Sequence, residues 1–499
     1  MKYHTIIIGA GSAGCVLASR LSENPNRSVL LLEAGPDYPD PADMPAEIRS
    51  GFNPTFTHDW GYASELGSLG RSIALPRGKL VGGCSATNAA IALRGAPSDY
   101  DEWAARGNPG WSFSEVLPFF RRVENDADFD DRWHGRDGPL PIRRDTRETL
   151  LPEHSAFLQA CSTLGYPRVA DHNAPSAIGA GVLPRNVVAG IRQSAALTYL
   201  DAARGRPNFT IRSGVLADRV VFDGLRAVGV RLKDSTDMIQ SDLVVLAAGA
   251  FGSPAILIRS GLGPADHLKS LDIDVLRDLP GVGQNLSDHL LLALHFAAPA
   301  GSKDVPGCQA MLTLQSPDIS VGHDLQIFPW TISPAEPGES PIFEIYVALM
   351  KPLSRGSLRL SASDPAAPPV IDLGFFTDPG DMPRVIHAVR VARRLAMTPP
   401  LSDVALQELF PGSQIPDVAT DLEAAIRTKA GTYFHPVGTC RMGPVGDAGA
   451  VVDARGNVHG VEGLSVVDAS IMSTIPAANT NLPTLMLAER CSAWLAEAG

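Results

Sequence analysis

The sequence predicts an α/β fold in which a Rossmann-like domain for a dinucleotide is interrupted by a second domain. A strand-like apolar run at Lys2–Ile8 leads into Gly9-Ala10-Gly11-Ser12-Ala13-Gly14 and then into an apolar helix pattern. Runs typical of further strands of such a domain recur in three distant regions of the 499 residues, separated by proline-rich stretches of less regular pattern. The nucleotide domain is therefore expected to be discontinuous.

The glycine-rich turn carries the argument for a dinucleotide. In such a turn Gly9 permits a tight bend, Gly11 lets the backbone approach a pyrophosphate, and Gly14 allows the helix to pack on the strand. The helix that begins with Ser12 and Ala13 offers free N–H groups to phosphates.

An acidic residue follows the second predicted strand. Val29–Leu32 is apolar and ends at Glu33, about 20 residues after the glycines, where a carboxylate hydrogen-bonds a ribose diol. A carboxylate there disfavours a 2′-phosphate. At this point FAD and NAD both remain open.

Composition narrows the class of protein. With 44% hydrophobic and 19% charged residues the chain is typical of a globular protein. The net charge of −12 argues against a nucleic-acid or anionic-membrane partner and favours a neutral or cationic small molecule. The six cysteines lack CxxC and metal-site spacings, so buried free thiols and no metal are expected. The best apolar stretch, Val244–Ile258, is broken by Gly252 and Pro254, so we expect no transmembrane segment and a cytoplasmic enzyme.

The predicted domains alternate along the chain. We assign residues 1–145, 195–290 and 434–499 to the nucleotide domain, and residues 146–194 and 291–433 to a substrate-binding domain. The nucleotide domain's predicted strands include Asn208–Asp223, Ala227–Leu232 and Leu243–Ala248. In the substrate domain Asp324–Trp330 alternates like a strand, which we expect to place Gln326, Phe328 and Trp330 on different faces, and Met382–Met397 is an amphipathic helix with its arginines outward.

Several separate segments resemble one family, the glucose-methanol-choline (GMC) oxidoreductases, over nearly the whole chain. Besides the first turn, they are Gly78-Lys79-Leu80-Val81-Gly82-Gly83-Cys84-Ser85-Ala86-Thr87-Asn88, Gly249-Ala250-Phe251-Gly252-Ser253-Pro254 with Ser260-Gly261-Leu262-Gly263, Pro280-Gly281-Val282-Gly283-Gln284-Asn285-Leu286-Ser287-Asp288-His289, and Phe434-His435-Pro436-Val437-Gly438-Thr439 with Val467-Asp468-Ala469-Ser470 and Asn479-Thr480-Asn481-Leu482-Pro483-Thr484. The resemblance implies an FAD domain and a substrate domain built on an antiparallel sheet flanked by helices.

The same resemblance implies which residues contact the cofactor. Gly82 and Gly83 let the backbone pass close to the flavin ring, Ser85 and Asn88 donate to its polar edge, and Asp468 contacts the ribityl chain or only caps a helix. Thr87 stands where some members have a histidine bonded to FAD, so noncovalent FAD is expected. The expected cofactor contacts are Gly9, Gly11, Ser12, Ala13, Gly14, Glu33, Ala34, Gly78, Gly82, Gly83, Ser85, Asn88, Ala89, Ala217, Ala248, Gly249, Asp468, Ala469, Asn481, Pro483 and Thr484.

Two residues are the candidate catalytic groups of an alcohol oxidation. Imidazole titrates near neutral pH, so His435 is expected to take the hydroxyl proton while hydride passes to flavin N5. Asn479 is expected to hydrogen-bond the same oxygen. The other histidines, His289 and His459 among them, are expected to be structural.

The expected substrate is a small primary alcohol, with aromatic and furanic alcohols as candidates, and O2 or a quinone-like compound takes the electrons. Candidate substrate contacts are Gln326, Phe328, Trp330, Tyr433 and Phe434, which also suit plain core packing. Two alternatives remain open, an FAD-containing hydroxynitrile lyase and a flavoprotein that reoxidises another protein's reduced cofactor. The oligomeric state is left open.

Overall fold

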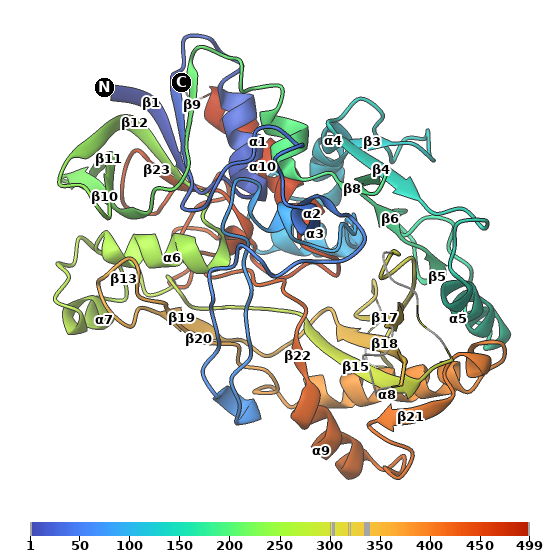
Figure 1. Ribbon diagram of the computed structural model, residues 1–499. Coiled ribbons are helices and arrows are strands. Elements are labelled where there is room, and N and C mark those ends of the chain that lie inside the picture. Colours follow the sequence, from blue (N-terminus) through green and yellow to red (C-terminus); the bar gives the residue numbers. More distant parts are fainter. Residues whose placement is uncertain are drawn as a thin grey trace.

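The computed structural model describes residues 2–299, 301, 305–317, 319, 321–333 and 340–497. Two large sheets organise the molecule, one at the upper left and one at the lower right of Figure 1. The predicted fold class is confirmed, because one sheet is a Rossmann-like, mostly parallel sheet and the other is antiparallel and flanked by helices.

The first sheet joins strands from three distant parts of the chain. Its order is β10-β11-β12-β1-β2-β9, and β23 also pairs with β12. The bounds are β1 Lys2–Ile8, β2 Val29–Leu32, β9 Phe209–Arg212, β10 Ala217–Asp223, β11 Arg226–Leu232, β12 Met238–Leu246 and β23 Leu464–Val466. Pairing of β1 with β2 and β12 is parallel, and β1 ends in four buried residues, as expected for a central strand.

One expected strand of this sheet is divided. Asn208–Asp223 does not form a single strand but two, β9 and β10, which pair with different partners, β2 and β11. Gly214 lies between them with a φ of +70°, a left-handed conformation that glycine adopts without strain. The alternating pattern continued through this turn, so the sequence did not reveal the break.

Three helices of the first region begin at or beside segments that are expected from the sequence to contact a cofactor. They are α1 (Ser12–Leu21), α6 (Gly249–Arg259) and α10 (Asn481–Glu497). Helix α1 contacts α10, and Figure 1 shows these two helices together, near the N-terminal strand. Residues from the two ends of the chain therefore meet in one layer.

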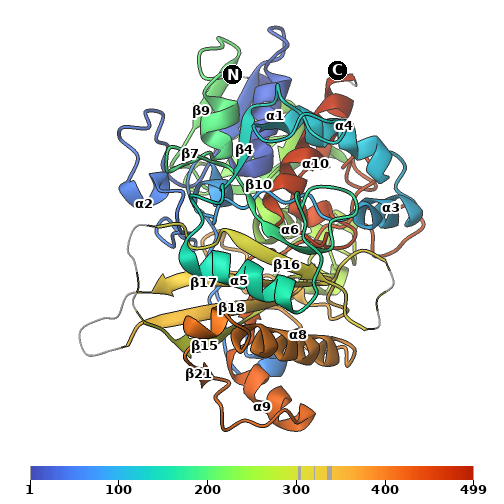
Figure 2. The same cartoon turned by 90° about the vertical axis from the view of Figure 1, so that its right-hand side faces the viewer.

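The second sheet is antiparallel throughout, in the order β21-β15-β18-β17-β16-β5, with β22 also paired to β15. The bounds are β5 Gly179–Val182, β15 Leu290–Ala297, β16 Ala310–Leu314, β17 Leu325–Ser333, β18 Ile342–Leu349, β21 Gln407–Phe410 and β22 Gly431–Thr432. Helices α5 (Pro152–Thr163) and α8 (Asp381–Ala396) both contact this sheet, as Figure 2 shows.

The expected arginine-bearing helix is α8, and its arginines are not all exposed. Arg384 is 4% exposed and its guanidinium lies 2.7 Å from Asp324 Oδ2. The expectation of outward arginines was wrong at this position because Asp324 offers a buried partner just before β17.

The remaining elements connect the two sheets or extend their edges. They are α2 Ala46–Arg49, α3 Pro97–Ala105, α4 Phe113–Val123, α7 Ala265–Ser270, α9 Ala419–Lys429, β3 Glu124–Asp126, β4 Leu140–Arg144, β6 Pro184–Arg185, β7 Val187–Val188, β8 Ile191–Arg192, β13 Leu262–Gly263, β14 Arg277–Asp278, β19 Ser357–Arg359, β20 Val370–Asp372, and the short turns η1 Gly67–Leu69, η2 Gly83–Ala86, η3 Ala196–Leu200, η4 Leu401–Asp403 and η5 Ala469–Ile471. None of the described helices is both long enough and apolar enough to cross a membrane.

A buried ion cluster lies at β3 and β4. Its members are Arg94, Glu124, Asp126, His134, Arg144 and Asp171. His134 lies 3.2 Å from Asp126 and 3.1 Å from Asp171. With His134 protonated, three cationic side chains face three carboxylates. Glu124, Asp126 and His134 offer ligand atoms within 4.8 Å of one another, but Arg94 and Arg144 pair with these carboxylates and make the cluster a poor metal site.

Candidate active site

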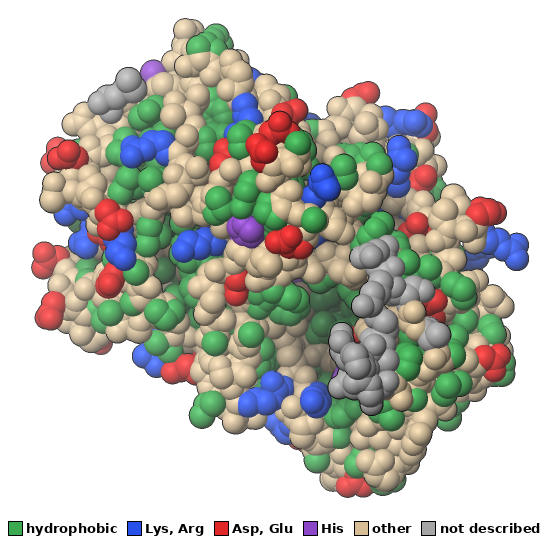
Figure 3. All heavy atoms as spheres, viewed as in Figure 1, with side chains coloured by type: hydrophobic (Ala, Val, Ile, Leu, Met, Phe, Trp, Pro, Cys, Tyr) green, Lys and Arg blue, Asp and Glu red, His purple; other side chains and the backbone are tan. Residues whose placement is uncertain are grey.

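A cavity of about 940 Å³ runs from the glycine-rich turn of the first sheet to the face of the second. Figure 3 shows a recess near the middle of the molecule, with mostly hydrophobic side chains on its visible walls. This volume is large enough for a dinucleotide and a small organic molecule together.

Close backbone packing shapes the nucleotide half of the cavity. A Cβ atom on Gly9, whose φ is +99°, would lie 2.6 Å from the Ala247 carbonyl oxygen. A Cβ on Gly83 would lie 2.7 Å from Gly11 Cα, and one on Gly14 would collide with the Gly9 carbonyl. Larger residues at these positions would therefore push the cavity walls apart.

Glu33 lies at the nucleotide end of the cavity, at the end of β2. Its two carboxylate oxygens each accept a backbone N–H, from Ala10 and Gly35, both at 2.9 Å. Burial raises the pKa of Glu33, and these two N–H donors oppose that rise. The carboxylate is held in one orientation at the cavity wall.

Asp468 is both a helix cap and a cavity residue. Its Oδ1 accepts the Ser470 N–H at 2.8 Å and caps η5, while Oδ2 accepts the Gly249 N–H at 2.8 Å. The two interpretations of this aspartate in the sequence are therefore compatible. Its bonds connect β23's C-terminal end to the start of α6.

The cavity wall contains most of the expected cofactor residues, namely Gly9, Gly11, Ser12, Ala13, Glu33, Ala34, Gly78, Gly83, Asn88, Ala89, Ala217, Ala248, Gly249, Asp468, Ala469, Asn481 and Thr484. Four other expected residues do not line the cavity, namely Gly14, Gly82, Ser85 and Pro483. Ser85 donates to Gly82 O at 2.5 Å and accepts the Ala195 N–H at 2.9 Å, so its hydroxyl is already used within the protein.

His435 and Asn479 meet at one point of the cavity. The His435 Nε2 atom lies 3.3 Å from Asn479 Nδ2, and Asn479 Oδ1 is buried without a hydrogen-bond partner in the described part of the chain. Because an amide N–H only donates, this contact leaves the His435 Nε2 lone pair as the acceptor. Burial lowers the pKa of His435 well below its usual value, and His289 and Arg77 lower it further. The imidazole is therefore neutral at neutral pH.

His289 contacts the other nitrogen of this imidazole, which the sequence did not indicate. The two Nδ1 atoms are 2.9 Å apart, and burial lowers the pKa of His289 to about 3. With Nε2 of His435 as the acceptor, its Nδ1 carries the proton and donates to His289 Nδ1. His289 thus fixes the tautomer and the ring orientation of His435.

The main chain of His435 is fixed by Asp288 and Thr432. Asp288 Oδ1 accepts the His435 N–H at 2.8 Å, and Oδ2 accepts the Thr432 hydroxyl at 2.5 Å. Burial raises the pKa of Asp288 to about 6, although these donors oppose the rise. Phe434 lies between Thr432 and His435 in the sequence. Its φ is +64°, an uncommon conformation for a bulky residue. The strained turn places His435 inward.

Aromatic side chains form the wall beside His435. Tyr433 lies 4.4 Å from the His435 ring, measured between ring centroids. Phe328 is nearly parallel to both Tyr346 and Tyr433, at 8° and 21°. Trp330 packs on Tyr346 at 67°. Tyr346 is a cavity residue that the sequence analysis missed, since β18 carried no distinctive motif.

The strand β17 corrects two expectations. Phe328 and Trp330 both contact Tyr346, so they share one face of β17, as a period of two residues requires, and the expectation of different faces was wrong. Gln326 is 0% exposed and does not reach the cavity, because its amide contacts the Ala477 carbonyl at 3.5 Å.

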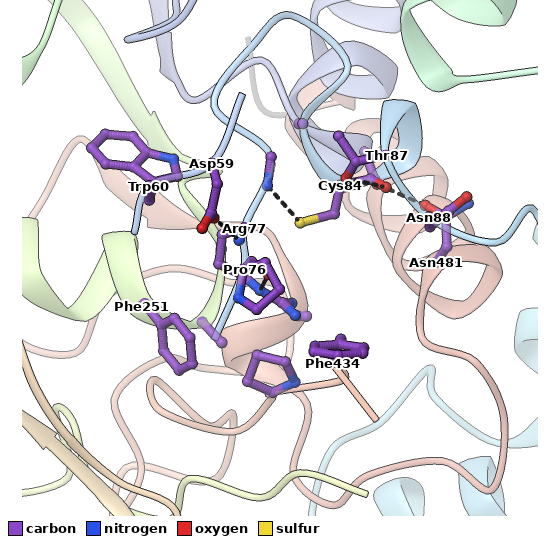
Figure 4. A pocket seen from close by; sticks show the side chains of 18 of the residues that line it. Asp59, Trp60, Pro76, Arg77, Cys84, Thr87, Asn88, Phe251, Phe434 and Asn481 are labelled. Atoms are coloured by element: carbon purple, nitrogen blue, oxygen red, sulfur yellow. Dashed lines mark hydrogen bonds between the residues drawn. The ribbon is translucent and has the colours of Figure 1, made fainter. Parts of the chain in front are cut away.

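The opposite wall carries charged and aromatic residues that the sequence also missed. Figure 4 shows Asp59, Trp60, Arg77 and Phe251 across the cavity from Asn88 and Asn481. Asp59 accepts the Arg77 N–H at 2.6 Å, and the Arg77 guanidinium lies 6.0 Å from the Phe251 ring. Cys84 also lines this region and is only half-buried, unlike the other five free cysteines.

Comparison with known proteins shows the family to which this chain belongs. The family models described as GMC oxidoreductase match residues 3–291 and 352–488. The chain belongs to the GMC oxidoreductase family. It is 36% identical to mouse mitochondrial choline dehydrogenase, over 98% of this chain and 89% of that protein, and 38% identical to an oxygen-dependent choline dehydrogenase of Serratia proteamaculans, over 98% and 95%.

A solved structure of similar size also matches. Pyridoxine 4-oxidase from Mesorbium loti superposes with a TM-score of 0.91 and 32% sequence identity, covering 99% of each chain. GMC oxidoreductases bind FAD, and the cavity fits that cofactor. The glycine cradle, the Glu33 carboxylate and Asp468 all line this cavity, and a dinucleotide needs a glycine turn and an acidic residue of this kind. The recognition of family and cofactor from the sequence is confirmed.

Proposed function

We propose that this GMC oxidoreductase oxidises a small, neutral primary alcohol of aromatic or furanic type to the aldehyde. The observation that carries the proposal is the convergence of His435 Nε2 and Asn479 Nδ2, 3.3 Å apart, beside an aromatic wall. Electrons pass to O2 or to a quinone-like acceptor.

Residues of this chain accept the hydroxyl proton of the alcohol and orient its oxygen. An alcohol oxygen that replaces the direct contact of the two groups donates its hydroxyl to His435 Nε2 and accepts an N–H from Asn479. As Nε2 takes the proton, the Nδ1–H bond to His289 holds the imidazolium in place. FAD, when bound, supplies the acceptor for the hydride of the carbinol carbon.

The wall favours a neutral aromatic substrate over a quaternary ammonium. Cationic substrates such as choline are bound by ring faces that converge on the cation. Here Phe328 stacks on both Tyr346 and Tyr433 in near-parallel planes, so the three ring faces do not converge on a common point as they would around a cation. The carboxylates among the described lining residues are Glu33, Asp59 and Asp468, and the hydrogen bonds of each lie away from this wall.

The test is anaerobic mixing of the holoenzyme with benzyl alcohol, furfuryl alcohol, aliphatic alcohols and choline, followed by air. We expect the first two to bleach the flavin absorbance faster than choline does. Fast recolouring with peroxide would identify an oxidase, and slow recolouring a dehydrogenase. Bleaching by no alcohol would contradict the proposal and favour the lyase or protein-partner alternatives.

Asn479→Ala is expected to slow flavin reduction by a factor of about 10 to 100, because one hydrogen bond to the reacting oxygen, worth roughly 1–3 kcal/mol, is lost. Stopped-flow absorbance under anaerobic conditions measures this rate. An unchanged rate would rule out the proposed role of the amide.

FAD is expected to leave the protein on acid precipitation, since Thr87 provides no imidazole for a covalent bond. The yellow colour should appear in the supernatant after centrifugation. Colour retained in the pellet after denaturation would show a covalent linkage.

A further inference from the structure

The loop Thr474–Asn479, which we call the amide loop, is held by side chains from both sheet regions. The first group comes from α3. Asp99 Oδ2 accepts the Ala477 N–H at 2.9 Å, and Glu102 Oε2 accepts the Thr474 hydroxyl at 3.1 Å. Trp103 Nε1 donates to Thr474 O at 3.0 Å. The loop is therefore attached to one helix at its first residue, Thr474, and again at Ala477, two residues before Asn479.

The second group comes from the antiparallel sheet. Lys351 follows β18, and its ammonium donates to Ile475 O at 3.0 Å. His323 Nε2 lies 2.9 Å from Ala477 O, which Gln326 also contacts. The substrate-wall sheet thus reaches the loop that ends at Asn479.

Lys351 connects the two groups. Its ammonium lies 3.0 Å from Asp99 Oδ1 and 3.2 Å from Glu102 Oε2, while the side chain is 25% exposed. Burial lowers the pKa of Lys351, but the two carboxylates outweigh it and raise the pKa overall. The Lys351 ammonium therefore pairs with both acids and donates to the loop's carbonyl at Ile475. Arg106 also pairs with Glu102, at 2.9 Å.

We propose that Lys351, together with Asp99, is a positioning pair for the reaction, which fixes Asn479 opposite His435 by clamping the amide loop between the two sheets. The inference rests on the proposed function, because it gives the pair an effect on rate through Asn479. A displacement of about 1 Å at a reacting centre costs on the order of 100-fold in rate.

The test compares Lys351→Met in the wild-type and Asn479→Ala backgrounds, with FAD content measured in each. In the wild-type background we expect the limiting rate of flavin reduction to fall about 10- to 100-fold, with a smaller change in alcohol affinity. In the Asn479→Ala background the same substitution should change the rate less than about threefold, because Lys351 acts through the position of the Asn479 amide and the effects of coupled groups are not additive.

A second readout needs neither cofactor nor substrate. Hydrogen exchange of residues 474–479 should accelerate in the Lys351→Met apoprotein. Arg393→Met is the matched control, because it breaks a comparably buried pair with Glu408, 2.6 Å apart, between α8 and β21. We expect it to leave both the reduction rate and exchange of the amide loop unchanged.

The outcomes separate the two hypotheses. Equal rate losses in both backgrounds, or no loss with Lys351→Met, would overturn the positioning role and leave the proposed function standing. No loss with Asn479→Ala alone would overturn the amide's proposed role and the inference with it. If Lys351→Met does not fold, Lys351→Met/Glu102→Gln, which keeps the local charge, replaces it in the same comparison.

Discussion

His435→Ala is expected to lower the rate of flavin reduction by alcohol by about 10²- to 10⁴-fold, the usual contribution of a general base. The loss follows from the unprotonated Nε2 of His435, which lies in the cavity 3.3 Å from Asn479 Nδ2 and is the atom that takes the hydroxyl proton. Anaerobic stopped-flow measures the rate, and the flavin spectrum of the same sample gives the FAD content. A rate within about tenfold of wild type would contradict the assignment of the base.

His459→Ala is the matched control for this variant. His459 contacts a backbone oxygen, Gly443 O, at 3.0 Å, and lies outside the cavity lining. Its removal should leave the reduction rate unchanged. The pH profile gives a further check, because only neutral His435 can accept a proton. Since its pKa lies well below the usual value, the rate should stay level as the pH falls through 6.5.

His134→Leu is expected to lower the free energy of unfolding by about 3–5 kcal/mol, because it leaves a buried charge without its partner. The imidazolium lies between Asp126 and Asp171, and its side chain is 1% exposed. Without it, Arg94 and Arg144 face three carboxylates. Urea unfolding at pH 6 measures the change.

The pH dependence of this effect has a definite sign. Burial lowers the pKa of His134, but its hydrogen bonds to Asp126, Asp171 and Glu124 outweigh burial and raise it to about 10. The stabilisation is therefore complete below about pH 6.5, where the unfolded imidazole also binds the proton, and is lost as the pH rises towards 10. The difference between wild type and variant should shrink over that range. A constant difference would contradict the raised pKa.

Arg226→Leu serves as the control for stability. Arg226 pairs with Glu462 at 3.1 Å, and both side chains are more than half exposed. Exposed ion pairs contribute roughly 0–1 kcal/mol to stability. The free energy of unfolding of this variant should therefore be close to that of the wild type.

The features that the sequence predicted correctly depend on residues that are close together in the chain. The bend at Gly9, the strands β1 and β2 and the acid at Glu33 follow from neighbouring residues alone. His435 and Asn479 were found because they lie within recognisable motifs. Their meeting at 3.3 Å spans 44 residues and is a property of the fold.

Residues that depend on long-range pairing were missed. His289 and His435 are 146 residues apart in sequence, and they meet because β15 pairs with β22, placing Leu290 opposite Thr432. No local pattern encodes that register. Ser85 was expected at the cofactor from its family-like segment and Gln326 at the substrate from its strand pattern, but their partners, Ala195 and Ala477, lie far along the chain.

The arrangement of the first sheet sets an order of events during synthesis. The glycine turn is made first, but β23, Asp468 and Asn481 follow more than 400 residues later. Chains emerge from the ribosome N-terminus first, so during most of its synthesis a nascent chain has only part of the wall of the active-site cavity. The cavity proposed to hold FAD is complete only after residues 464–484 have emerged and paired, so we expect cofactor loading to be one of the last steps in the maturation of this enzyme.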